Sequence, residues 1–129
     1  MKYMLIHCVD ESMFGPEPDG GIPFPPAARA LEAWVSDLTA RGVLLHGGRL
    51  RPVSDATTVQ VREGDLLVSD GPFAETKEQV AGYDVIDCAD LDEAIEIASR
   101  HPTAGIGTIE VRPFWEGWAH SGVNQEVGA

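Results

Sequence analysis

The sequence predicts a single α+β domain of the ferredoxin-like type, in which two helices cover one face of a sheet. Three observations favour this fold class. The 129 residues are the usual size of one domain and can bury a core without metals or disulfides. The strand-like and helix-like segments follow a βαββαβ order with an extra hairpin before the third main strand. Two helices suffice to cover only one face of the sheet.

The first half of the chain contains the clearest helix. Alternating apolar residues predict a strand over 2–9, and five of the nine prolines fall in the loop 10–26 that follows. Apolar residues at helical spacing then predict a helix over 27–41, with Gly42 where a C-terminal cap belongs. The apolar stripe that we expect to pack on the sheet consists of Leu31, Trp34, Val35 and Leu38.

The second half supplies the remaining strands and one more helix. Strands are expected at 43–50, 57–62, 66–69, 80–89 and 107–113. The turn 63–65 joins two of them into a hairpin, and the capping-box spacing of Asp90 and Glu93 begins the second helix. The domain therefore spans 1–114, and 115–129 is expected to be a partly disordered tail.

The two faces of the predicted sheet differ in polarity, because successive side chains of a strand point to opposite faces. We assign the more apolar set to the helices, and this set consists of Met4, Ile6, Cys8, Ile109 and Val111. The mixed set is left for a ligand pocket or a partner sheet, and it consists of Tyr3, Leu5, His7, Val9, Thr108, Glu110 and Arg112. Packing of two such sheets would form a homodimer.

The segment 70–78, with the sequence DGPFAETKE, is the most informative motif of the chain. Gly71 can adopt backbone angles that other residues rarely reach, and Pro72 restricts both itself and Gly71, so the chain must turn here. We expect Phe73 to anchor this turn against the body of the protein. The charged side chains then face water, a ligand or a second subunit, and they are Asp70, Glu75, Lys77 and Glu78.

Together with segments further along the chain, this motif resembles the DGPF branch of the YCII-related family. The later segments are Gly82-Tyr83, Asp90–Ala94 and Glu110–Pro113, and the resemblance extends from the first strand to about Phe114. It implies a ferredoxin-like domain that forms a homodimer through its sheets, the arrangement called a dimeric α+β barrel. It implies no particular reaction.

The resemblance carries two further implications. Some relatives lie beside alternative sigma factors, which implies a regulatory protein partner. Better-studied relatives suggest a His and Asp pair as the active site, with the His near the start of the first helix, but this chain has Ala27, Ala28 and Arg29 there. The resemblance therefore does not identify catalytic residues in this chain.

Six residues are candidates for binding a small molecule, because they place polar or aromatic groups in the motif or on the mixed face. They are His7, Asp70, Phe73, Glu75, Lys77 and Arg112. Several also have a purely structural interpretation. Asp70 would accept hydrogen bonds from backbone N–H groups of the turn. Lys77 would join a solvated charge network, and Arg112 would form an ion pair between subunits. His7 is either an acid or base near neutral pH or a satisfied interface residue.

Neither a metal nor a cofactor is predicted. His7 and His46 lie on strands that an intervening strand separates, roughly 10 Å apart, which is too far for one zinc ion. Cys8 and Cys88 are expected at opposite edges of the sheet, so they would remain reduced. His101 is expected to contact the exposed carbonyl groups of a helix end.

The net charge of the chain limits the classes of partner that it can bind. Twenty-one acidic and nine basic residues give a net charge of −12, which repels nucleic acids and anionic membranes. The N-terminus fits neither a signal peptide nor a membrane span, and two cysteines fit a reducing compartment. A cytoplasmic location is therefore expected.

Three functions follow from these observations. In the leading hypothesis, the chain is a small homodimeric domain that binds a small molecule in a partly polar pocket between the sheets. In the alternative, it is an interaction or regulatory module linked to an alternative sigma factor, and the DGPF motif is a structural element of the dimer. The third is acid/base or oxygenase chemistry of the dimeric barrel type, for which the sequence contains no cofactor motif. The loop 11–26 is either a lid over the pocket or a dimer arm.

Overall fold

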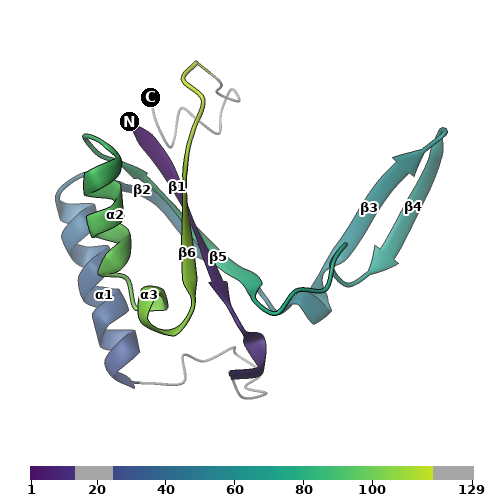
Figure 1. The fold of residues 1–129 in the computed structure, drawn as a ribbon, viewed down its shortest axis with the longest axis horizontal. Coiled ribbons are helices and arrows are strands. Elements are labelled where there is room, and N and C mark those ends of the chain that lie inside the picture. The colour runs from purple at the N-terminus through teal and green to yellow at the C-terminus, as the bar shows by residue number, and fades with distance from the viewer. Residues whose placement is uncertain (14–24, 118–129) are drawn as a thin grey trace.

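The computed structural model describes residues 1–13 and 25–117, and it shows an α+β body from which a hairpin projects (Figure 1). The strands are β1 (Lys2–Val9), β2 (Leu44–Arg49), β3 (Thr57–Arg62), β4 (Asp65–Asp70), β5 (Gln79–Asp87) and β6 (Thr108–Pro113). The helices are α1 (Pro25–Ala40), α2 (Leu91–Ser99) and the short α3 (Thr103–Ile106), and 3-10 turns occupy Glu11–Met13 and Val53–Asp55.

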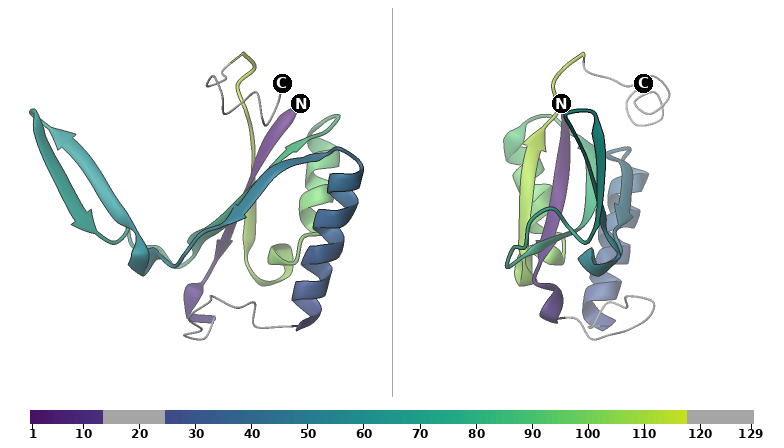
Figure 2. Two further views of the ribbon diagram at one scale, coloured as in Figure 1. Left: turned by 180° about the vertical axis from the view of Figure 1, so that it is seen from behind. Right: turned by 90° about the vertical axis from the view of Figure 1, so that its right-hand side faces the viewer.

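Four of the strands form one antiparallel sheet in the order β2-β5-β1-β6. Both long helices lie on one face of this sheet, and β3 and β4 form a separate hairpin that extends from the other side (Figure 1 and Figure 2). This strand order and the place of the hairpin in the chain confirm the predicted ferredoxin-like topology. Among the described residues, no helix is long and apolar enough to cross a membrane.

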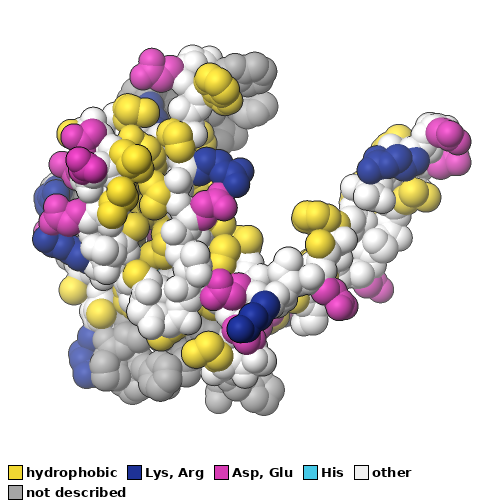
Figure 3. Space-filling model, in the orientation of Figure 1, with side chains coloured by type: hydrophobic (Ala, Val, Ile, Leu, Met, Phe, Trp, Pro, Cys, Tyr) yellow, Lys and Arg dark blue, Asp and Glu magenta, His cyan; other side chains and the backbone are white. Residues whose placement is uncertain are grey.

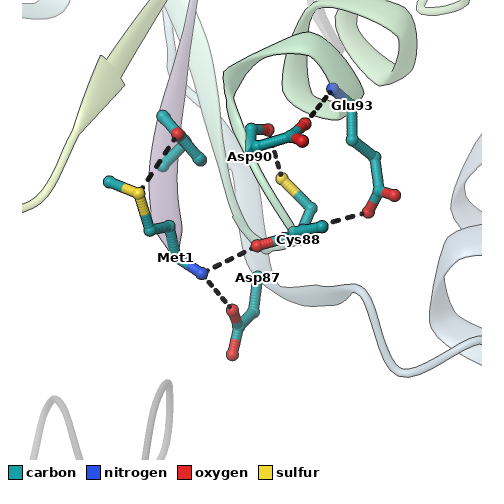
Figure 4. Close-up of polar contacts among 7 residues, drawn as sticks. Met1, Asp87, Cys88, Asp90 and Glu93 are labelled. Carbon is teal, nitrogen blue, oxygen red and sulfur yellow. Dashed lines mark hydrogen bonds and ion pairs between the residues drawn. The ribbon is translucent and has the colours of Figure 1, made fainter.

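The predicted capping box determines where α2 begins. Asp90 accepts a hydrogen bond from the Glu93 amide at 2.9 Å, and the Glu93 side chain accepts one from the Ala89 amide at 3.3 Å (Figure 4). Beside this turn the N-terminal ammonium group donates to the Cys88 carbonyl oxygen at 2.7 Å. These contacts hold the beginning of β1 against the end of β5, next to α2.

The core lies between the helices and the sheet. Leu5 and Ile86, from the two central strands, are completely buried. The Trp34 indole of α1 donates a hydrogen bond of 2.9 Å to the Ile97 carbonyl of α2, which ties the two helices together. The other buried members of the core are Tyr3, Leu38, Cys88, Ala94 and Ala98. Burial of each large apolar side chain contributes about 1.5–3 kcal/mol.

The prediction of which β1 residues face the helices is wrong. The residues under the helices are Tyr3, Leu5, His7 and Val9, whereas the half-buried residues on the other face are Met4, Ile6 and Cys8. On β6 the prediction is confirmed, because Ile109 and Val111 lie on the helix-covered face and pack on the core. Both sets of β1 residues are largely apolar, so alternation alone could not distinguish them. We call the uncovered face, which carries Met4, Ile6 and Cys8, the open face.

The turn in the 70–78 motif is formed by hydrogen bonds rather than by Phe73. Gly71 has the expected left-handed backbone, with a φ of 87°, and its amide donates to the Ala56 carbonyl at 2.7 Å. Thr58 Oγ1 donates to the Gly71 carbonyl, also at 2.7 Å. Phe73 is 87% exposed, so the expectation that it anchors the turn against the protein is wrong within one chain.

Other expectations concern the two cysteines, the two strand histidines and the irregular segments. Cys8 and Cys88 are free thiols, and they lie toward opposite ends of the antiparallel pair β1 and β5. The sheet order places β5 between β1 and β2, so a strand separates His7 from His46, as predicted. Most of the loop 11–26 and of the tail 115–129 lies outside the described residues, and their expected roles stay predictions.

Candidate functional site

A cluster of three polar side chains is buried between the sheet and the helices. His7 comes from β1, Asp84 from β5 and His101 from the segment between α2 and α3, and each is at most 8% exposed. One possible ligand atom of each residue lies within 4.8 Å of the others. Buried polar groups cost free energy unless they are paired, so their contacts indicate what the cluster can do.

Strand pairing brings His7 and Asp84 together. The register of β1 and β5 places His7 opposite Gly82 and Leu5 opposite Asp84. Both polar side chains therefore point to the helix-covered face. His7 Nε2 and Asp84 Oδ2 are 2.6 Å apart, which is a short hydrogen bond. The pair is held by the centre of the sheet rather than by a loop.

Gly47 on β2 makes room for the Asp84 carboxylate. It is the register partner of Asp84, and a Cβ atom placed on it would lie 2.0 Å from Asp84 Oδ1. A side chain at this position would push the carboxylate away from His7. At the neighbouring Gly48, the added atom would lie 3.5 Å from Tyr83 Cε1, an ordinary contact. Of these two neighbouring glycines on β2, it is therefore Gly47 that has no room for a side chain.

Hydrogen bonds assign the protons on both buried imidazoles. The Asp84 carboxylate accepts from His7 Nε2, so Nε2 carries the proton and the lone pair of Nδ1 is left over. This Nδ1 atom is buried and has no hydrogen-bond partner in the described part of the chain. His101 Nδ1 accepts the Thr103 amide at 3.0 Å, so its own proton is on Nε2, 3.9 Å from Asp84 Oδ2.

His101 is held in its neutral form. Burial, and then repulsion from the nearby His7, lowers its pKa from 6.5 to about 3. The ring stacks on His7 with centroids 4.1 Å apart and meets Trp34 edge-on at 4.8 Å. At neutral pH it is therefore an uncharged ring with one N–H donor, packed between a second imidazole and an indole.

The three residues are close enough to be considered as ligands of a metal ion. Their hydrogen bonds favour a different use. Nε2 of each ring carries a proton, and a protonated nitrogen has no lone pair for a metal, so in this arrangement His7 Nδ1 is the ring nitrogen of the cluster whose lone pair is left over. A metal bound at these atoms would require both rings to exchange their hydrogen bonds, including the one from the Thr103 amide. The cluster in this arrangement is suited to moving a proton.

The structure does not bring the six predicted ligand-binding residues together within one chain. His7 is in the buried cluster, whereas Arg112 on β6 lies on the open face, where it forms an ion pair with Glu110. The other four lie at the end of β4 and in the exposed loop after it, and they are Asp70, Phe73, Glu75 and Lys77. Their assignment as ligand-binding residues stays a prediction.

Sequence reasoning missed Asp84 and misplaced His101. An acidic residue in the middle of the apolar strand 80–89 was a usable signal, because a carboxylate is rarely buried without a partner. The expectation that His101 contacts helix carbonyl groups is wrong, since its Nδ1 accepts an N–H group and its ring is buried. Only the folded chain shows that this ring meets His7.

The chain matches known proteins in sequence and in structure. A model of the YCII-related domain matches residues 1–117. An uncharacterized protein of Rhizobium meliloti (strain 1021) is 49% identical over 88 residues, which are 67% of this chain and 71% of that protein. The solved structure of 5-chloro-2-hydroxyhydroquinone dehydrochlorinase of Burkholderia phenoliruptrix AC1100, in complex with 2,5-dihydroxybenzoquinone, matches with a TM-score of 0.48. That match has 15% sequence identity and covers 91% of this chain and 96% of the other.

Proposed function

The chain belongs to the YCII-related family, and we propose that it binds a small uncharged molecule and moves a proton on that molecule with His7. The observation that carries this proposal is the state of the His7 ring. His7 Nε2 donates a hydrogen bond to Asp84, while the lone pair of Nδ1 has no partner in the described part of the chain. A buried acceptor without a partner costs free energy, and a ligand that donates to Nδ1 would remove that cost.

Asp84 prepares His7 to act as a base. The carboxylate accepts the Nε2 proton at 2.6 Å, which orients the ring and stabilises the positive charge that forms when Nδ1 takes a proton. Imidazole is the side chain that changes charge near neutral pH without special tuning. The same ring can return the proton to a different atom of the ligand. Such a cycle consumes no second substrate.

His101 supplies the complementary donor. Its Nε2–H group is 3.9 Å from the Asp84 oxygen, longer than a hydrogen bond, so it can donate to an oxygen atom of a ligand. A carbonyl or hydroxyl oxygen next to an acidic hydrogen fits a site with one acceptor and one donor. We therefore expect isomerisation by proton transfer within a small carbonyl or phenolic compound.

The charge of the chain favours a neutral ligand. A net charge of −12 lowers the local concentration of anions around the protein. Arg112, the candidate most suited to an anion, lies on the open face and is paired with Glu110. An anionic ligand would therefore gain neither long-range attraction nor a contact with this cation at the buried cluster.

Proton exchange tests the proposal without a guess at the overall reaction. Small carbonyl and hydroxyl compounds are screened for a thermal shift, and each stabilising compound is incubated with the protein in D₂O. We expect NMR to show deuterium entering beside the carbonyl or hydroxyl group. His7→Gln should slow this exchange by about 10²–10⁴-fold, the usual range for loss of a general base.

His46→Gln is the matched control, because His46 is an exposed imidazole on β2 whose Nδ1 lies 2.6 Å from the Tyr83 hydroxyl. It should leave the exchange rate unchanged. Nitrogen NMR adds a readout that needs no ligand, since His7 should show the tautomer protonated at Nε2. Equal exchange rates for the wild type and His7→Gln, or a neutral His7 protonated at Nδ1, would contradict the proposal.

A further inference from the structure

The Trp34 indole holds the end of α2 from which His101 extends. Its Nε1–H group donates a buried hydrogen bond of 2.9 Å to the Ile97 carbonyl oxygen. That oxygen lies in the last turn of α2, where carbonyl groups lack the usual partners inside the helix. It also accepts a hydrogen bond from the Arg100 amide at 3.2 Å. A side chain of α1 therefore fixes the backbone of α2 just before His101.

The same indole contacts the His101 ring itself. The two ring centroids are 4.8 Å apart, and the rings meet at an angle of 85°. His7 stacks on the imidazole, and the Thr103 amide donates to its Nδ1 atom, so Trp34 completes its surroundings. We propose that Trp34 is a positioning residue, which holds His101 in the orientation where its Nε2–H group acts as the donor. This inference rests on the proposed function, in which His101 donates to an oxygen atom of the ligand.

Trp34 also separates His101 from water. A groove of about 430 Å³ lies between α1 and α2, and its lining includes Trp34 and the exposed residues Arg41 and Arg100. Because the same indole lines this groove and contacts His101, a smaller side chain would let water approach the imidazole from the groove. Burial is the larger cause of the lowered pKa of His101, so the indole also helps to keep this donor uncharged.

Nitrogen NMR of the protein without a ligand gives the first test. The His101 ring of the wild type should be neutral at about pH 5, since its pKa is about 3. Trp34→Phe keeps an aromatic ring but lacks the N–H group and is smaller, so the pKa should rise toward 6.5 and part of His101 should be protonated at about pH 5. Trp34→Leu removes the aromatic ring as well and should raise the protonated fraction further. The titratable groups beside the imidazole among the described residues, His7 and Asp84, are the same in every variant.

Deuterium exchange into a stabilising compound gives the second test. Trp34→Phe should lower the maximal exchange rate roughly tenfold, because a misplaced donor slows the proton transfer. The half-saturating concentration of the compound should stay the same, because the contact is needed in the transition state rather than for binding. Leu38→Val is the matched control, since Leu38 belongs to the same helix and core but makes neither the hydrogen bond to Ile97 nor the ring contact with His101. It should change neither quantity.

A measurement on the wild type alone does not depend on the folding of any variant. The Trp34 indole N–H should exchange slowly with D₂O, because it is buried and bonded to a carbonyl oxygen. Fast exchange of this proton, a His101 ring that stays neutral at about pH 5 in both Trp34 variants, or equal loss of rate in Trp34→Phe and Leu38→Val would each overturn the proposal. A wild type that exchanges no compound would contradict the proposed function alone, and the NMR measurements would still decide the role of Trp34.

Discussion

The buried cluster and the hairpin depart from the usual distribution of side chains in opposite ways. Under the helices, His7, Asp84 and His101 place ionisable groups where proteins ordinarily place apolar ones. On the hairpin, which stands apart from the sheet and the helices (Figure 3), cross-strand pairing places four exposed apolar side chains on one side. We call this side the arm face, and it consists of Val59, Val61, Leu66 and Val68. The cluster leaves one nitrogen atom without a partner among the described residues, whereas the hairpin leaves a whole face uncovered. In the proposed function a ligand completes the first region, and we expect the homodimer that the family resemblance implies to cover the other.

This difference in scale predicts different responses to substitution. The cluster depends on a 2.6 Å hydrogen bond and on the space beside Gly47, so the displacement of one atom changes it. The arm face depends on area, to which each side chain adds a modest amount. Substitutions in the cluster should therefore change the stability of a single chain, whereas substitutions on the arm face should change association.

Gly47→Ala should have the largest effect on stability. The new methyl group would lie 2.0 Å from Asp84 Oδ1, and the carboxylate cannot move without disturbing its bond to His7. We expect the free energy of unfolding to fall by about 2–3 kcal/mol, as it does when a core is overpacked. Denaturant unfolding measures the change. Gly48→Ala is the control and should stay within about 0.5 kcal/mol of the wild type.

A second background separates the clash from a general need for glycine on β2. In an Asp84→Ala protein the carboxylate is gone, so Gly47→Ala should cost much less than it does in the wild type. If Gly47→Ala costs the same in both backgrounds, the carboxylate is not what Gly47 accommodates.

The next effect is a pH dependence that belongs to His101. Its pKa is lowered from 6.5 to about 3 in the folded chain, so the unfolded chain binds the proton first as the pH falls. The contribution of the neutral ring to stability is complete above pH 6.5 and is lost as the pH falls toward 3. We expect this loss to reach about 1 kcal/mol per pH unit.

His101→Phe isolates this contribution, because a phenyl ring can keep the contacts with His7 and Trp34 but cannot titrate. The variant also loses the hydrogen bond from the Thr103 amide, a cost that does not vary with pH. Denaturant unfolding between about pH 7 and about pH 4.5 should therefore show a shallower slope in the variant. Identical slopes in the two proteins would remove His101 as the titrating group.

The fold could be predicted because its signals are local. The helical stripe with Trp34 and Leu38, the capping box of Asp90 and Glu93, and the turn 63–65 each determine a short segment, and the structure confirms them. The orientation of β1 could not be predicted in this way. Its two sets of residues are similar in polarity. Asp84, which favours burial of the set that contains His7, lies on a different strand.

The candidate site could be predicted only in part, because its members come together through tertiary pairing. His7 was a candidate, but its partners Asp84 and His101 come from β5 and from the segment between α2 and α3. Residues of the 70–78 motif were predicted to bind a ligand because its charged residues are close in sequence. Such residues need only a turn to be neighbours, and in the structure they remain largely exposed. Density of charge along the sequence was therefore a weaker guide than an acidic residue in the middle of an apolar strand.

The smallest expected effect is the dependence of the dimer's dissociation constant on salt concentration. Two copies that each carry a net charge of −12 repel one another, so the apolar contact has to overcome this repulsion. Raising the salt from about 50 mM to about 500 mM screens the repulsion, and sedimentation should show the dissociation constant of the dimer falling roughly threefold. Leu67→Lys, on the side of the hairpin opposite to the arm face, removes part of the negative charge and should reduce this dependence. A dissociation constant that rises with salt would contradict this expectation. It would mean that ion pairs between the two copies, formed by residues such as Glu110 and Arg112, stabilise the dimer and that the arm face does not.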